Sequence, residues 1–201
     1  MIIIVDYKLG NSGSILNMLK YLNINAEITS DNKKILDADK LIISGVGSFD
    51  TGMCNMQNLG LTDLLQEKVV FRKTPVLGIC LGMQLLGLKS EEGVEKGFGW
   101  VDGVTRKFDN KLLPVPHMMW NTIMLAGKSR LFMNFETEPR FYFAHSYFFD
   151  CAIKSSIIGS TSYGIEFTSV IEQENIIGVQ FHPEKSHKMG MRLLSNFNSE
   201  Y

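Results

Sequence analysis

The sequence predicts an α/β protein with a doubly wound, mostly parallel sheet and a small antiparallel extension. Two observations indicate this fold class. In the first half of the chain, apolar, largely β-branched runs bounded by turn residues alternate with segments of helical periodicity. From Gly97 onward, short segments rich in glycine, proline and aromatic residues replace that alternation, which favours irregular and antiparallel strands.

The elements of the first half follow in order. Ile2–Val5 is a continuous apolar run, as expected of a strand buried on both faces. Residues 11–22 carry apolar side chains at the spacing of one helical face, with Asn11 or Ser12 available as the N-cap. We expect further strands over residues 26–29, 39–44 and 75–79, and a helix over residues 62–70 capped by Thr62.

The second half predicts a meander of strands over residues 156–161, 165–172 and 176–181. Turn residues separate these runs at Tyr163-Gly164 and at Glu174-Asn175. A closing helix is expected over residues 188–198, and the apolar positions that would face the sheet are Met189, Leu193, Leu194 and Phe197.

Length and composition favour one domain spanning residues 1–201. The chain has 45% hydrophobic residues, which suffice for one core. A formal net charge of -1 gives no electrostatic signature of nucleic-acid or membrane binding. Three cysteines without metal-ligand spacing favour a reducing compartment, and the apolar run at the N-terminus is too short for a signal peptide. We therefore expect a cytoplasmic protein.

The most informative stretch is residues 76–86, VLGICLGMQLL. An apolar run, Gly78-Ile79-Cys80-Leu81-Gly82, and then an unbranched apolar segment fit a strand, a sharp turn and a helix, the geometry of a nucleophile elbow. The thiol of Cys80 would project from the sheet edge, where the positive end of the following helix favours its thiolate. A buried cysteine beside two packing glycines explains these five residues equally well.

A glycine loop follows the strand expected over residues 39–44. The segment Gly45-Val46-Gly47-Ser48-Phe49 lacks the further glycines or the Gly-Lys-Ser of a phosphate-binding loop. Backbone N–H groups that bind an oxyanion are therefore a better interpretation than nucleotide binding.

The strand expected over residues 176–181 ends at His182-Pro183-Glu184. His182 could take the thiol proton and later return it to a leaving group, while Glu184 fixes the imidazole tautomer. Alternation along an extended segment places these two side chains on the same side. Together with the elbow cysteine, this arrangement favours catalysis over a structural histidine.

The segments GICLGMQLL and GVQFHPEKS resemble the class I glutamine amidotransferases, whose glutaminase domain has a flavodoxin-like fold. Within that family, the chain resembles the glutaminase subunits of imidazole glycerol phosphate synthases. The matching segments run in order along the whole chain: DYKLGN, SGVGSF, SEEG, VPHMMWN and FYFAHSY.

The resemblance implies hydrolysis of glutamine to glutamate and ammonia, with no metal or organic cofactor. Cys80 would be the nucleophile, His182 the general base and acid, and Glu184 the orienting carboxylate. The implied oxyanion hole consists of Gly45, Val46, Gly47 and the N–H of Leu81. The implied glutamine-binding residues are Gln84, Glu92, Ser146 and Tyr147, and from the sequence alone Glu92 would otherwise be read as part of a solvated helix end.

The resemblance also implies a partner. Free ammonia is mostly protonated near neutral pH, so it must reach its acceptor without equilibrating with water. In the family a separate (β/α)8 barrel synthase receives it and forms a heterodimer with the glutaminase. The positions that match partner-facing ones are His117, Trp120, Asn121, Tyr142 and Lys185, for which ordinary packing is the alternative.

Three positions depart from the family's usual pattern: Lys8 and Met119 where glycine is usual, and Ser44 where proline is usual. The segments GSILNM and EKSHKMGMRLL resemble a paralogous branch that supplies ammonia for amidination of a surface sugar. Histidine biosynthesis and sugar amidination therefore both remain open as the pathway. A cysteine peptidase or esterase and a noncatalytic scaffold that binds a barrel partner are the alternatives from other classes.

Overall fold

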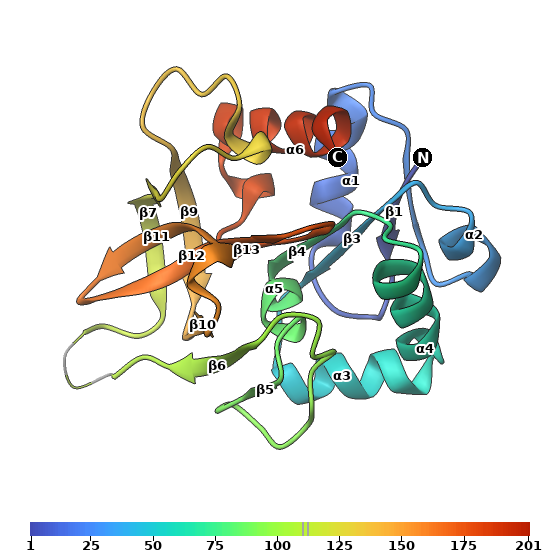
Figure 1. Cartoon of the computed structure of the whole chain (residues 1–201), viewed down its shortest axis with the longest axis horizontal. Helices are drawn as coiled ribbons and strands as arrows, with labels where there is room; N and C mark the ends of the chain where they lie inside the picture. The colour runs from blue at the N-terminus through green and yellow to red at the C-terminus, as the bar shows by residue number, and fades with distance from the viewer. Residues whose placement is uncertain (110, 112) are drawn as a thin grey trace.

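A computed structural model describes residues 1–109, 111 and 113–201 of the chain. Five parallel strands form one half of its main sheet, in the order β2, β1, β3, β4, β13 (Figure 1). Their bounds are Ala26–Thr29, Ile2–Val5, Lys40–Gly45, Val76–Cys80 and Ile176–Val179, respectively. This strand order is that of flavodoxin-like, doubly wound sheets, so the predicted fold class is confirmed.

Antiparallel strands extend the sheet beyond β13. They follow in the order β12 (Ile165–Gln173), β10 (Tyr147–Cys151) and β6 (Gly103–Lys107), and β5 (Lys89–Ser90) closes the edge. Two further strands join beside β12: β11 (Ile157–Tyr163) pairs with β12, and β8 (Met124–Leu125) pairs with β11. A separate two-stranded sheet pairs β7 (His117–Thr122) with β9 (Arg140–His145). The predicted meander and both of its turns are therefore confirmed.

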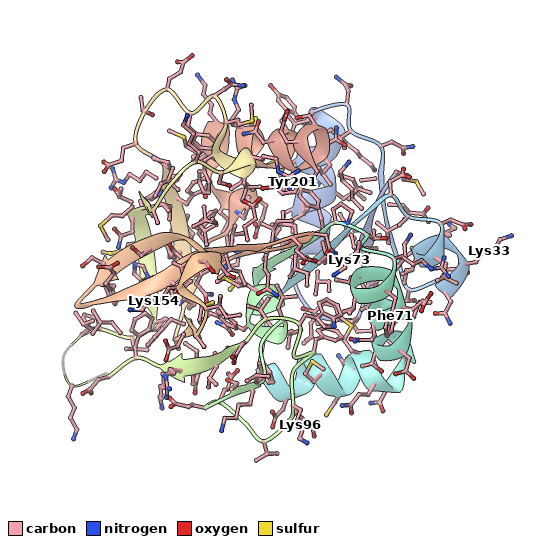
Figure 2. The ribbon with its side chains drawn as sticks, in the orientation of Figure 1. Lys33, Phe71, Lys73, Lys96, Lys154 and Tyr201 are labelled. Atoms are coloured by element: carbon pink, nitrogen blue, oxygen red, sulfur yellow. The ribbon has the colours of Figure 1, made fainter. Side chains whose placement is uncertain are left out.

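Helices cover both faces of the parallel strands (Figure 1). Ile3 and Ile43 belong to the core that packs under α3 (Phe49–Asn58), α4 (Leu61–Gln66) and α5 (Leu81–Leu85). Ile2 and Ile42 belong to the opposite core, under α1 (Ser12–Tyr21) and α6 (His187–Glu200). Neighbouring residues of one strand thus enter different cores, which explains why these strands are continuous apolar runs. Side chains fill the space on both sides of the sheet (Figure 2).

Several predicted boundaries are corrected by the structure. Helix α4 starts at Leu61 rather than at Thr62, and its N-cap is Gly60, in the left-handed conformation and without a side-chain hydrogen bond. The helix continues as a π-helical turn over Glu67–Phe71, which leaves Phe71 exposed (Figure 2). The capping prediction for Thr62 was wrong because a left-handed glycine between α3 and α4 redirects the chain there instead.

Other differences concern short elements. The alternation of strands and helices implied a helix between residues 29 and 39 without giving its bounds, and this helix is α2 (Asn32–Leu36). Helix α3 was not predicted. The side chains of Asp31 and Ser48 cap these two helices. Asn11 does occupy the N-cap position of α1, although its side chain makes no capping hydrogen bond. No helix within the described ranges combines the length and the apolar character that a membrane span requires.

The two elbow glycines allow β3, β4 and α5 to approach closely. A Cβ atom on Gly82 would lie 1.8 Å from the carbonyl oxygen of Ile43 on β3. A Cβ atom on Gly78 would lie 2.8 Å from the backbone of Gly82. Backbone atoms cannot move aside as flexible side chains do, so only glycine fits these two positions without displacing a strand.

We predict that Gly82→Ala lowers the free energy of unfolding by more than about 3 kcal/mol, because the added methyl group would overlap the backbone of β3. The matched control is Gly13→Ala in α1, where a Cβ atom meets nothing within 4 Å. That substitution should stabilise the protein by about 0.5–1 kcal/mol. Urea unfolding of both variants measures the difference, and equal effects would contradict the close contact.

Candidate active site

Cys80 is the last residue of β4 and the N-cap of α5, with φ 54° and ψ −109°. A positive φ is costly for a residue with a side chain, and such strain concentrates at functional sites. The register of the sheet pairs Gly45 of β3 with Cys80. Cys80 is only 6% exposed. The conformation is that of the predicted nucleophile elbow, and it places the thiol beside the glycine loop.

His182 and Glu184 follow β13, the strand adjacent to β4. The Nδ1 atom of His182 lies 2.8 Å from Oε1 of Glu184, and both side chains are 2% exposed. Because a carboxylate oxygen only accepts, Nδ1 carries the proton. The other ring nitrogen, Nε2, is buried without a hydrogen-bond partner among the residues that the structure describes. The predicted pairing of these side chains is present, and it leaves Nε2 free for a reacting group.

The charges of the site act on His182. Burial alone would lower its pKa, but the sulfur of Cys80 and the carboxylate of Glu184 raise the pKa to about 10. Cys80 therefore acts on the imidazole although the two side chains form no regular hydrogen bond. Catalytic contacts of this kind are often long in the absence of substrate. The charges around the ring therefore favour the imidazolium form of His182.

A cavity of about 400 Å³ opens over Cys80. Its lining contains all four predicted glutamine-binding residues, two residues of the glycine loop and several residues around the mouth: Gln84, Glu92, Ser146, Tyr147, Val46, Gly47, Pro116, Met118, Ala144, His145 and Lys185. The fold therefore brings together residues that lie far apart in the sequence. The volume suits a small molecule of amino-acid size.

Glu92 lies at the edge of the cavity and also caps a helix. Its Oε2 atom accepts a hydrogen bond from the backbone N–H of Phe49 at 2.7 Å, at the start of α3. The pKa of Tyr147 is raised by burial and by the nearby carboxylate of Glu92. The carboxylate therefore has a defined hydrogen-bond partner and lines the cavity together with Tyr147, which the interpretation as a solvated helix end did not predict.

The glycine loop lies beside the thiol. Gly45 ends β3, while Val46 and Gly47 are exposed and line the cavity with Cys80. Gly47 has φ 143°, which favours glycine. The N–H of Leu81 belongs to the first turn of α5 and needs no partner within the helix. These backbone groups lie next to Cys80, and their role as an oxyanion hole remains a prediction.

Two polar residues of the site were missed in the sequence. Gln180 is fully buried, and its Nε2 atom lies 3.7 Å from Sγ of Cys80. It stands two residues before His182, so the alternation that placed Glu184 beside His182 would also have found it. His145 lines the cavity and donates from Nδ1 to the carbonyl oxygen of Tyr147 at 2.7 Å.

A chain of hydrogen bonds connects this histidine to β7. Nδ1 of His117 lies 3.0 Å from Nε2 of His145, and Nδ2 of Asn121 lies 3.3 Å from Nε2 of His117. Burial lowers the pKa of His117 to about 4 and that of His145 to about 3, so both rings are neutral at pH 7. The direction of donation is then fixed, from Asn121 through His117 and His145 to the carbonyl oxygen of Tyr147.

The residues predicted to face a partner differ in exposure. His117 is fully buried, stacked against Phe143 and Tyr163, so in this structure it lies behind the surface. Trp120, Tyr142 and Lys185 form a partly exposed cluster, and Lys185 also lines the cavity. Asn121 lies apart from this cluster, because its side-chain nitrogen donates to the ring of His117 and to the carbonyl oxygen of Ser162. Trp120 packs edge-on against Tyr142, and Nζ of Lys185 lies 5.7 Å from the Tyr142 ring centre.

The structure shows the surroundings of the three residues that depart from the family's usual pattern. Lys8 has φ 64°, the conformation for which glycine is usual, and its backbone N–H and Nζ both bond to Asp6. Ser44 is buried, with its hydroxyl 3.4 Å from that of Ser12. Met119 is 46% exposed on β7 beside Trp120. Within the described residues, no group of three or more potential ligand side chains is arranged to hold a metal ion.

We predict that Cys80→Ala lowers the pKa of His182 from about 10 by about 1–3 units. The substitution removes the sulfur that favours the charged ring, while burial continues to lower the pKa. The imidazole should therefore lose its proton at lower pH in the variant than in the wild type. An NMR titration of the ring nitrogens tests this, with Cys54→Ala as the control. An unchanged His182 titration would contradict the electrostatic coupling.

Comparisons with known proteins agree with this geometry. Residues 3–200 match the family described as Glutamine amidotransferase class-I. The chain is 52% identical over 199 residues to imidazole glycerol phosphate synthase subunit HisH 2 of Methanococcus maripaludis, covering 98% of each chain. It is 43% identical over 198 residues to the protein of the same name from Pseudomonas aeruginosa, again covering 98% of each.

A solved structure shares the fold. The crystal structure described as a glutamine amidotransferase has a TM-score of 0.75 to this chain, at 18% identity, and the match covers 97% of this chain and 96% of that one. Family match, full-length identity and fold agree. The chain therefore belongs to the class-I glutamine amidotransferase family, among the imidazole glycerol phosphate synthase subunits HisH.

Proposed function

We propose that this chain is the glutaminase subunit of an imidazole glycerol phosphate synthase and acts as one domain over residues 1–201. The observation that supports it most is the position of Cys80. Its strained backbone holds the thiol under a cavity of amino-acid size, next to the buried pair of His182 and Glu184. Glu92, on the rim of the same cavity, supplies a negative charge for the α-ammonium group of glutamine.

The reaction begins with attack of the Cys80 sulfur on the side-chain amide carbon of glutamine. Nε2 of His182 takes the proton of the thiol, and the imidazolium that results is favoured because the pKa of that ring is raised to about 10. The tetrahedral intermediate collapses when Nε2 gives this proton to the amide nitrogen, so ammonia leaves and a thioester remains. Water then attacks the thioester, His182 takes its proton, and glutamate and the thiolate are released.

Neighbouring groups serve these steps. Glu184 accepts from Nδ1 of His182 and stabilises the imidazolium, as orienting carboxylates do in triads. The backbone N–H groups of Leu81 and of the loop Gly45 to Gly47 would hold the oxyanion. Gln84, Ser146 and Tyr147 complete the lining that contacts glutamine.

The ammonia must reach an acceptor outside this chain. The relatives in Methanococcus and Pseudomonas are named as subunits of a synthase, which supports a partner subunit. We propose a (β/α)8 barrel synthase that docks beside the cavity on Trp120, Tyr142 and Lys185, with His117 and Asn121 supporting that surface from within. Tryptophan and tyrosine are among the residue types that contribute most of the binding energy at protein interfaces. Both subunits would act in the cytoplasm, in histidine biosynthesis.

The alternative pathway is amidination of a surface sugar, with a related barrel as partner. The residue that supports this alternative is Met119. Its exposed side chain adds bulk next to Trp120, at a position where glycine is usual in the family, and could therefore fit a different partner. The glutaminase chemistry would be the same, and only the partner and the acceptor would differ.

We predict that the purified chain releases glutamate from glutamine, and that an imidazole glycerol phosphate synthase cyclase subunit with its nucleotide substrate increases the rate strongly. Cys80→Ala should reduce the rate at least about 10³-fold, because the nucleophile is lost, without loss of partner binding. Retained turnover would refute the triad. Glutaminase activity that the cyclase does not stimulate would favour the sugar-amidating branch. Turnover of esters but not of glutamine would favour a cysteine peptidase or esterase.

We also predict that Glu92→Gln raises the KM for glutamine about 10- to 100-fold with little change in kcat, the cost of one hydrogen bond to a charged group. An amide oxygen can still accept from Phe49, so the cap of α3 is kept. Steady-state kinetics measure the effect, and urea unfolding serves as the control for stability. An unchanged KM would restrict Glu92 to capping the helix.

A further inference from the structure

Gln180 has no assigned role in the proposed reaction. It lies between the end of β13 and His182, on the same side of the extended chain as His182. The side chain is fully buried, and its Nε2 atom is 3.7 Å from Sγ of Cys80. A buried amide that donates a hydrogen bond to the sulfur of Cys80 can stabilise negative charge on that sulfur.

The orientation of this amide is fixed by its neighbours. Nε2 of Gln84 lies 3.0 Å from the carbonyl oxygen of Tyr147, which can only accept, so this atom of Gln84 is the donor nitrogen. The same nitrogen lies 3.1 Å from Oε1 of Gln180 and donates its second hydrogen there. With its oxygen held by Gln84, Gln180 must present its N–H groups to the sulfur.

The orientation of the Gln84 side-chain amide is supported in turn by His145. The carbonyl oxygen of Tyr147 also accepts from Nδ1 of His145, at 2.7 Å. Because His145 is buried and neutral, this bond does not reverse near pH 7. Donors therefore converge on the Tyr147 carbonyl, and the two glutamine side chains have one consistent arrangement.

We propose that Gln180 is a further catalytic residue, which donates an N–H to the Cys80 thiolate, and that Gln84 is the positioning residue that holds it in this orientation. The inference rests on the proposed glutaminase function. A thiolate in a buried site needs hydrogen-bond donors, and a donor that favours the charged form lowers the pKa of the thiol. His182 supplies one stabilising partner, and Gln180 supplies a second that carries no charge.

Alkylation of Cys80 by iodoacetamide as a function of pH tests this without using glutamine. The modified Cys80 peptide is quantified by mass spectrometry, and the midpoint of the rate profile reports the thiol pKa. Gln180→Met keeps the length of the side chain but removes the donor. We expect its midpoint to rise by about one unit, which lowers the alkylation rate about tenfold at pH values below the midpoint, with kcat for glutamine reduced more than KM is changed.

Two further variants keep the test decisive. Gln84→Met leaves Gln180 in place but frees its amide to rotate, so a smaller rise of the midpoint in the same direction is expected. Gln173→Met is the matched control, since Gln173 on β12 bonds to the carbonyl oxygen of Trp100, far along the chain from the elbow. Its midpoint should equal that of the wild type, and a rise as large as that of Gln180→Met would show a general effect on the fold and overturn the inference.

The outcomes separate this inference from the proposed function. Unchanged midpoints in both Gln180→Met and Gln84→Met, with normal glutamine turnover in the wild type, would overturn the role of Gln180 alone. A raised midpoint in a protein that releases no glutamate would support the donation to sulfur and overturn the proposed reaction. A raised midpoint together with a loss of kcat is the result that supports both.

Discussion

The approach of the Gly82 backbone to the carbonyl oxygen of Ile43 is the contact on which the site depends. It brings the start of α5 against β3 and holds Cys80 at φ 54° between them. From that position the sheet register places Gly45 on one side of the thiol. The parallel pairing of β4 with β13 delivers His182 on the other side. A side chain at position 82 would overlap β3 and so separate the nucleophile from the glycine loop.

The polar groups of the site interact strongly with one another because they are buried. The thiol of Cys80 and the pair of His182 and Glu184 are almost inaccessible to solvent, so their charges interact in a medium that screens them weakly. Each polar group then needs a defined partner. Oriented amides and neutral imidazoles supply these partners around the cavity, and the same network extends from Tyr147 through His145 to the buried face of β7. The proposed docking surface adjoins the cavity, because Lys185 belongs to both.

Local patterns were enough to predict the parallel strands, the elbow and the pairing of His182 with Glu184, because each depends on residues close in sequence. Gly78 and Gly82 flank Cys80, and Glu184 is two residues from His182. The start of α4 was wrong because a left-handed Gly60, rather than the side chain of Thr62, sets it. The contacts of Glu92 with Phe49, and of Gln84 with Gln180, join segments far apart in the chain. Only the folded sheet brings those residues together, so sequence periodicity cannot show which hydrogen bonds they make.

The most direct test of the account is covalent labelling with a chloroketone analogue of glutamine, followed by peptide mass spectrometry. Cys54 and Cys151 serve as internal controls, since both are free thiols outside the cavity lining. The account predicts that the label appears on Cys80, that glutamine protects against it, and that His182→Ala slows it. Equal labelling of all three cysteines, or labelling that glutamine does not prevent, would contradict a glutamine site built around Cys80.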